Sequence, residues 1–157
     1  MLNFVKNLVA LNLALANKVR SITAYDEALA LHGAKDFKKA LPLMLESAML
    51  GYPAAMCMLG SMYLLGQGVK EDGKEAEKWL VAAMDAGFEG AVSVLGMAYA
   101  TGKAGVKIDV PKARIMLKTS ASKGDEQSSR MLQMMDRGEG MFANLKQTSK
   151  GKKPRSS

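Results

Sequence analysis

Cysteine and histidine are almost absent from this sequence, which has only Cys57 and His32 among its 157 residues. A single cysteine excludes an intramolecular disulfide, and this favours a reducing compartment. One thiol and one imidazole, far apart along the chain, do not make a ligand set for zinc, so we expect no metal and no cofactor. We interpret His32 as a surface residue or as a helix histidine with a satisfied hydrogen bond.

The sequence also lacks the residue arrangements that catalysis requires. It has no nucleophile with a credible histidine and acid, no phosphate-binding loop and no cluster of metal ligands. The segment Gly66-Gln67-Gly68 fits a helix stop better than a nucleotide cradle. We therefore expect neither enzyme activity nor a small-molecule substrate.

Aromatic residues make up only 6% of the chain, whereas methionine occurs 13 times. Methionine side chains are flexible and polarisable, so surfaces built from them adapt in shape, which suits a core or a contact surface. No apolar run reaches the roughly 18 residues that a transmembrane helix needs, so we do not expect a membrane span.

Acidic residues are scarce at the C-terminal end, and this explains much of the net charge of +7. Residues 1–137 carry 17 basic and 14 acidic residues, a net +3, whereas residues 138–157 carry five basic and one acidic, a net +4. The last segment has too little apolar surface to offset its ordering entropy, so we predict a disordered basic tail. The tail is an alternative binding site for nucleic acid or an anionic membrane. Its basic residues are Lys146, Lys150, Lys152, Lys153 and Arg155.

The N-terminal segment has two interpretations. Residues 8–16 are apolar, with Lys6 before them and an Ala14-x-Ala16 pair after which a signal peptide could be cleaved. Small or polar residues also recur about every 3.5 positions, which is typical of an amphipathic helix. That stripe is Asn3, Asn7, Ala10, Ala14, Asn17 and Ser21.

We favour the helix, over residues 1–21, and with it a cytoplasmic location; a signal peptide over residues 1–16 would instead indicate a periplasmic or secreted protein. The helix would cap the first repeat or occupy the concave side of the domain. Its buried stripe would be Leu2, Val5, Leu8, Val9, Leu15, Val19 and Ile22.

An internal repeat is the main feature of the sequence. The pattern Ala-x-x-x-Leu-Gly-x-x-Tyr-x-x-Gly starts at Ala55 and again at Ala91, a displacement of 36 residues. A period of 20–50 residues is typical of solenoids, whose units bury their apolar faces by stacking on one another. Each copy predicts a helix A, a glycine-rich turn and a helix B. In the first copy helix A spans residues 53–65.

Aspartates mark the predicted starts of the B helices. Asp72 is expected to cap the first, with Glu75 completing a capping box, and Asp109 to cap the second. The same spacing from Asp36 predicts a shortened unit before them. The repeat domain, residues 22–137, then consists of a shortened unit 22–51, repeats 52–87 and 88–124, and a capping helix 125–137, followed by the tail 138–157.

Packing explains the other repeated residues. A glycine within a helix costs about 1 kcal/mol relative to alanine, so Gly60 and Gly96 are expected where a neighbouring helix presses on the backbone. The aromatic side chains of Tyr63, Tyr99 and Trp79 would fill the wider gaps between helices.

Together, the repeated motif, the Gly-Val turns at Gly68 and Gly105, the capping aspartates and the Lys/Glu-Ala of helix B closely resemble the Sel-one-like repeat (SLR) family, a relative of tetratricopeptide repeats. The resemblance implies an all-α fold, a right-handed α-solenoid of antiparallel helix pairs. It also implies an adaptor or scaffold, often in bacterial signalling, secretion or host interaction, without catalysis. Met116 in place of the helix B aromatic departs from the pattern.

We expect the A helices to line a concave surface that binds another protein through its helix or extended segment. The specific hypotheses are an adaptor, a secretion-linked chaperone or a toxin-neutralising partner. An alternative explanation of the methionine-rich first A helix, with Met56, Met58 and Met62, is that neighbouring helices cover it. The candidate binding residues are Cys57, Ser61, Leu64, Leu65, Ser93, Met97, Ala100 and Thr101.

Overall fold

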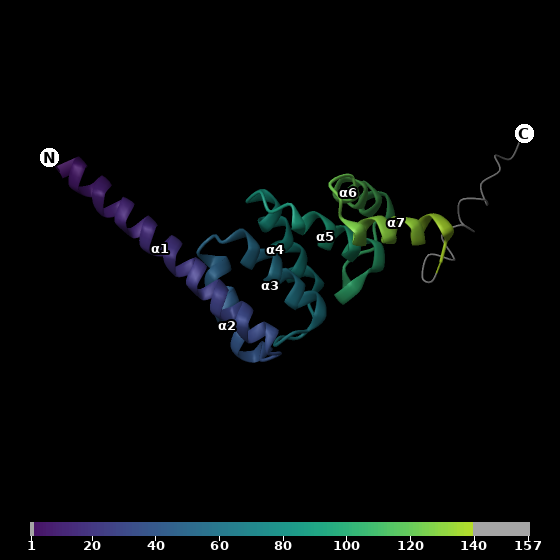
Figure 1. Ribbon diagram of the computed structural model, residues 1–157, viewed down its shortest axis with the longest axis horizontal. Coiled ribbons are helices and arrows are strands. Elements are labelled where there is room, and N and C mark those ends of the chain that lie inside the picture. The colour runs from purple at the N-terminus through teal and green to yellow at the C-terminus, as the bar shows by residue number, and fades with distance from the viewer. Residues whose placement is uncertain (1, 140–157) are drawn as a thin grey trace, which may run out of the picture.

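The computed structural model describes residues 2–139, and every regular element in that range is helical. This confirms the predicted fold class, an α-solenoid of antiparallel helix pairs (Figure 1). The five tail residues from Lys146 to Arg155 lie outside the described range. The elements are α1 (Leu2–Gly33), α2 (Phe37–Met49), α3 (Pro53–Leu65), α4 (Gly73–Asp85), α5 (Gly90–Thr101), the short 3₁₀ helix η1 (Lys103–Gly105), α6 (Val110–Ser122) and α7 (Glu126–Arg137).

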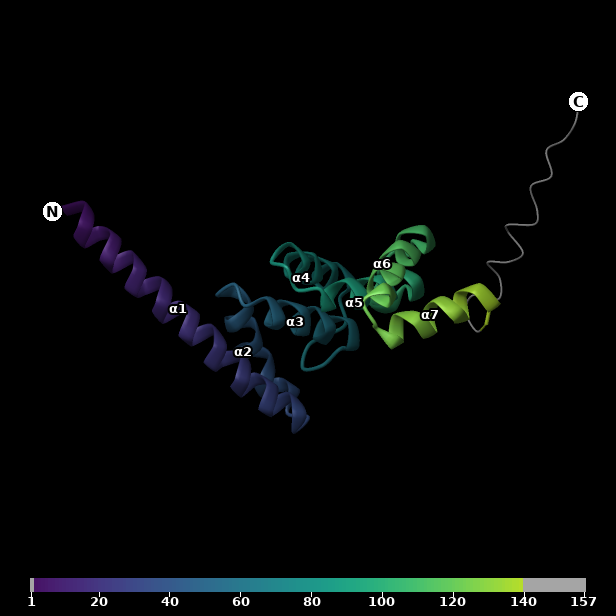
Figure 2. The ribbon, with the colours of Figure 1, turned by 45° about the horizontal axis from the view of Figure 1, so that its top comes forward.

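Each helix packs mainly against its neighbours along the chain. The pairs α1–α2, α3–α4 and α5–α6 make the most extensive contacts, and α2–α3, α4–α5 and α6–α7 join one pair to the next. Figures 1 and 2 show the same progression from α1 at one end of the molecule to α7 at the other. A chain of nearest-neighbour interfaces is the architecture that the 36-residue repeat predicts.

The predicted aspartate caps are present at the starts of the B helices. The Asp72 carboxylate accepts the backbone N–H groups of Lys74 and Glu75, and Asp109 accepts that of Lys112. Asp36 and Asp125 cap α2 and α7 in the same way. Because each cap satisfies N–H groups that have no partner inside the helix, it stabilises the start by about 1 kcal/mol.

The predicted capping box at Glu75 is wrong. The Asp72 N–H, which the box would satisfy, donates instead to the Tyr63 carbonyl oxygen at 3.1 Å, and Glu75 pairs with Lys78. In the next repeat the Asp109 N–H donates to Tyr99 in the same way, at 3.0 Å. The start of each B helix is thus tied to the backbone of its A helix.

Both glycines inside the A helices lie at close helix–helix contacts, as predicted. A Cβ atom built on Gly60 would lie 2.7 Å from Leu80 Cγ, and one built on Gly96 would lie 3.1 Å from Met116 Cβ. Tyr99 is buried, and Tyr63 and Trp79 pack partly buried against the two apolar clusters that form the core. The small residues thus allow close backbone approach, and the rings fill the remaining space.

Helix α1 is continuous over 32 residues, so residue 21 lies inside one helix that also supplies the first half of the shortened unit. Only Ser21, Ala24 and Ala28 are buried in it. The predicted buried stripe is wrong: its seven side chains are exposed, as is Phe4. No described helix is long and apolar enough to cross a membrane.

The stripe on α1 is exposed because α2 is too short to cover it. Its antiparallel packing on α1 ends near Arg20, which forms an ion pair with Glu46, and near Ser21, whose carbonyl accepts the Ser47 hydroxyl at 2.6 Å. Residues 2–16 therefore extend beyond the repeat domain as a single projecting helix (Figures 1 and 2).

Candidate functional site

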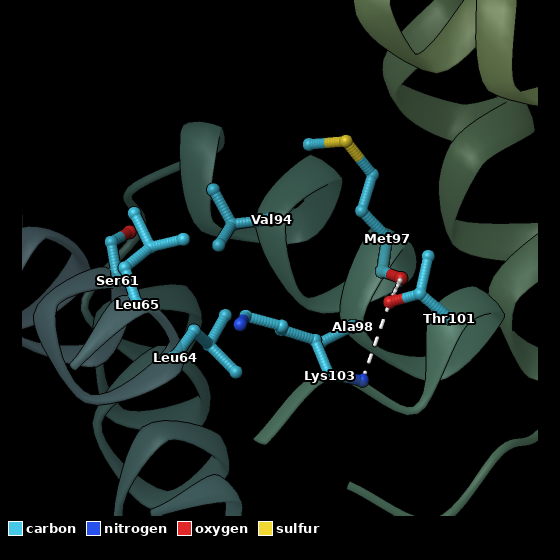
Figure 3. Close-up of a pocket in the computed structure, with 8 residues that line it drawn as sticks. All are labelled: Ser61, Leu64, Leu65, Val94, Met97, Ala98, Thr101 and Lys103. Atoms are coloured by element: carbon cyan, nitrogen blue, oxygen red, sulfur yellow. Dashed lines mark hydrogen bonds between the residues drawn. The ribbon is translucent and has the colours of Figure 1, made fainter. Parts of the chain in front are cut away.

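A pocket of about 230 Å³ lies between α3 and α5, the A helices of two successive repeats. We call it the A-helix groove. Figure 3 shows the α3 side chains on one side and the α5 side chains on the other, with Lys103 of η1 beside them. The lining residues are Ser61, Leu64, Leu65, Val94, Met97, Ala98, Thr101 and Lys103.

The hydroxyl groups in the groove are bonded within their own helices. Ser61 Oγ donates to the Cys57 carbonyl at 3.0 Å, and Thr101 Oγ1 donates to the Met97 carbonyl at 2.9 Å. Because these donors are already satisfied, the groove presents a mainly apolar surface, and Leu65 is its most accessible apolar residue at 55% exposure. The groove is suited to burying apolar side chains rather than to acid–base chemistry.

Lys103 provides the charge at the edge of the groove. Its ammonium group pairs with Glu71 at 2.8 Å, and both side chains remain 45% exposed. The stem of Lys103 extends toward Leu64 (Figure 3). An exposed pair of this kind contributes little to stability, so a carboxylate on a bound molecule would compete with Glu71 at low cost.

Five of the eight candidate residues come together in this groove: Ser61, Leu64, Leu65, Met97 and Thr101. Cys57, Ser93 and Ala100 do not line it. Cys57 and Ala100 are buried, not outward-facing as expected, because each lies on the side of its helix that packs into the core. Leu64 is buried for the same reason, with 6% exposure, although it also contributes to the wall of the groove. Ser93 is partly buried, and its hydroxyl donates to the Gly90 carbonyl at 3.0 Å.

Burial also lowers the chemical reactivity of Cys57. It raises the pKa of the thiol from 9.0 to about 11. At neutral pH the side chain is a neutral thiol, and it is the thiolate that acts as nucleophile and metal ligand. The residues described by the structure contain no group of three or more histidine, cysteine or acidic side chains able to hold a metal.

Three groove residues, Val94, Ala98 and Lys103, were not expected from the sequence. The signal for two of them was present, because residues 94, 97, 98 and 101 follow the helical spacing of one face of α5. Lys103 had no such signal, because its position depends on the turn that η1 forms.

The methionines of α3 are covered mainly by neighbouring helices. Met62 is fully buried, and Met56 and Met58 pack partly buried against the core. This supports the alternative in which α3 is apolar all round because it lies between other helices. Of the methionines within residues 2–139, only Met97 of α5 lines the groove.

His32 is a helix histidine with a partner. One ring nitrogen lies 2.9 Å from Gln67 Oε1, and the ring packs against Phe37 with centroids 4.9 Å apart. The contact joins the end of α1 to the turn after α3. Its role is therefore structural.

Comparison with known proteins agrees with this architecture. The family model for the Sel1 repeat matches residues 53–88 and 91–125. A Sel1 repeat protein from Oxalobacter formigenes has a TM-score of 0.62 and 23% sequence identity, over 73% of this chain and 47% of that one. The protein c5321, a protective antigen of uropathogenic Escherichia coli strains with an SLR fold, has a TM-score of 0.66 and 30% identity, over 79% of this chain and 27% of that one.

This chain thus spans less than half the length of either protein. No curated protein sequence matches it. The matched segments coincide with the helix pairs α3–α4 and α5–α6, whose caps, close-packed glycines and tyrosines are described above. The resemblance seen in the sequence is confirmed: the chain contains two Sel1 repeats, at residues 53–88 and 91–125.

Proposed function

We propose that this protein acts by binding another protein, and that a helix or an extended segment of the partner lies in the A-helix groove. Sel1-repeat proteins generally mediate protein–protein interactions and are typically non-catalytic scaffolds. The observation that supports this site is the groove itself, whose apolar walls come from corresponding faces of two successive A helices. Repeat solenoids commonly bind along such surfaces.

The size and chemistry of the groove favour a peptide side chain over a free small molecule. Its volume of about 230 Å³ is below the roughly 300–1,000 Å³ of typical small-molecule pockets. Its only ionic group is Lys103, at the rim. We propose that one or two apolar side chains of the partner enter between Leu65 and Met97, with an acidic residue beside Lys103.

The wider role follows the same reasoning. A non-catalytic adaptor, a secretion-linked chaperone or a toxin-neutralising partner would each use a groove of this kind, and we propose a cytoplasmic location. Because the domain has few repeats, its binding surface is short, and it suits one helix or one compact domain of the partner.

The test uses two changes that are matched in chemistry and differ in place. Leu65→Asp introduces a charge into the groove, whereas Ile115→Asp introduces one at an exposed apolar position of α6 outside it. The partner is first identified by affinity capture from the native cell, and its affinity is then measured with purified proteins by calorimetry.

We expect Leu65→Asp to weaken binding by about 2 kcal/mol, or roughly 30-fold, as for an interface hot spot, and Ile115→Asp to leave it unchanged. Equal affinity for both variants would exclude the groove. Loss of binding only when residues 144–157 are removed would instead indicate the basic tail, the alternative that the sequence left open.

A further inference from the structure

The projecting part of α1 has a broad and continuous apolar surface. Nine large apolar side chains in residues 2–19 are exposed, and none is covered by another helix in the part of the chain that the structure describes. We call these residues the apolar face of α1. They are Leu2, Phe4, Val5, Leu8, Val9, Leu11, Leu13, Leu15 and Val19.

The helical repeat gathers these side chains on one side. At about 100° per residue, all nine lie within an arc of about 200°, with Val5 and Val19 near its middle and Leu8 and Leu15 about 40–60° to one side of it. Within residues 2–19, Asn12 is the one polar side chain inside this arc, and it lies at the middle. The opposite side carries asparagine and alanine, for example Ala10 and Ala14.

This apolar face points away from the repeat domain. Ser21, Ala24 and Ala28, the buried residues of α1, lie on the same side of the helix as Ala10 and Ala14. Helix α2 packs on that side of α1 only at Ser21 and beyond, and it leaves the apolar arc open. A flat surface can therefore contact the whole face without meeting α2.

The charges of residues 1–25 indicate which kind of surface the apolar face of α1 contacts. The first acidic residue of the chain is Asp26, so residues 1–25 contain only basic charges. Lys6 and Lys18 lie at the two edges of the apolar arc, and neither forms an ion pair within residues 2–139. Lysines at these edges can lay their stems on an apolar phase and place their ammonium groups at the level of lipid phosphates.

The same features disfavour a second copy of this chain. A coiled-coil seam is narrow, so a single partner helix would leave much of an arc of about 200° exposed. Paired helices also use opposite charges beside the seam, whereas residues 1–25 offer no acidic group in either copy.

We propose that residues 2–22 of α1 form an interfacial helix that lies in the plane of an anionic membrane, with the apolar face of α1 toward the acyl chains. At 1.5 Å per residue this segment provides roughly 30 Å of contact. The helix attaches the repeat domain to the membrane surface and leaves the A-helix groove available to a protein partner.

The test measures binding of the purified full-length chain to lipid vesicles by co-sedimentation. One set of vesicles is phosphatidylcholine with one quarter phosphatidylglycerol, and the other is phosphatidylcholine alone. We expect stronger binding to the anionic vesicles, weakened by salt, because cationic side chains near such a surface are attracted within the Debye length.

Matched variants distinguish the contribution of the apolar face to vesicle binding from that of the rest of the helix. Leu8→Gln with Leu15→Gln should weaken binding at least about tenfold, because two large side chains lose their apolar environment. Ala10→Gln with Ala14→Gln makes the same polar additions on the opposite side and should change binding less than about twofold. Lys6→Gln with Lys18→Gln should weaken binding to anionic vesicles about 30-fold.

Circular dichroism gives the folding control, because these positions lie outside the packed domain and should leave its unfolding transition unchanged. Equal binding by the leucine and alanine variants would overturn the proposal. So would a dimer, seen by light scattering and lost in the leucine variant, without vesicle binding. A chain recovered from its native cells with Asn17 as its first residue would also overturn it, since residues 1–16 would then be a removed leader.

Discussion

Replacing Gly60 with alanine tests whether this position sets the distance between α3 and α4. A Cβ at Gly60 would lie 2.7 Å from Leu80 Cγ and 3.1 Å from the Ala76 carbonyl oxygen. Leu80 is fully buried, so its side chain has little room to move. The overpacking costs about 1–3 kcal/mol, whereas alanine improves helix propensity by about 1 kcal/mol. Because a contact of 2.7 Å is too close for a real Cβ, the packing cost belongs in the upper part of that range, and we expect Gly60→Ala to reduce the free energy of unfolding by about 1–2 kcal/mol.

Gly96→Ala is the matched control from the next repeat. Its Cβ would meet Met116 Cβ at 3.1 Å and Leu117 Cγ at 3.2 Å, so its neighbours need to shift by only a few tenths of an ångström. The gain in propensity then offsets most of the packing cost, and we expect a change of less than about 1 kcal/mol.

The assay is urea unfolding followed by circular dichroism and by the fluorescence of Trp79, the single tryptophan. The two probes should give coincident transitions, because a repeat protein can otherwise unfold in parts. A Leu80→Ala background adds a double-mutant cycle: there Gly60→Ala should destabilise less, since the contacts with Leu80 are gone and only the 3.1 Å contact with the Ala76 carbonyl oxygen remains. Two results would contradict this reasoning. One is a Gly60→Ala variant as stable as the unchanged chain, and the other is a loss of unfolding free energy that is equally large in the Leu80→Ala background. Either would show that the contact with Leu80 does not limit the approach of α3 and α4.

Three further predictions follow from burial and capping. At pH 8 the native Cys57 thiol should react with iodoacetamide roughly 100-fold more slowly than in the urea-unfolded chain, because its pKa is raised from 9.0 to about 11 and less thiolate is present; equal rates would contradict its burial. Asp72→Ala should lower the free energy of unfolding by about 1 kcal/mol, measured in urea, whereas Asp72→Asn should restore most of it. Leu64→Asp should unfold the protein at a much lower urea concentration than Leu65→Asp, because only Leu64 is buried; similar midpoints would show that the two positions are equally exposed.

The start and end of α3 illustrate what local signals predict. Pro53 is tolerated in a first turn that has no N–H partner to lose, and Gly66 adopts the left-handed conformation that ends the helix, with φ of +66°. Predicted helix 53–65 is therefore the observed Pro53–Leu65. The aspartate caps are predictable for the same reason, since the groups involved lie within three residues of one another.

The candidate site was predictable only in part. Helical spacing correctly predicted that Ser61, Leu65 and Met97 lie on the groove side of their helices. It did not predict how much of that side a neighbouring helix covers. Cys57 has much the same local pattern as Ser61 one turn later, yet it is buried. Burial depends on the helices that pack from other parts of the chain.

By itself, the sequence determined that this protein is a stack of helix pairs, where most of the pairs begin and end, and which glycines allow close contact. Caps, turns and a 36-residue period act over short distances, so they can be recognised without coordinates. Only the tertiary structure decided which Asp72 bond forms, where the A-helix groove opens, and that α1 extends past the end of α2 with its apolar face uncovered. Each of these depends on the relative lengths and positions of separate helices, which packing determines only after the chain has folded.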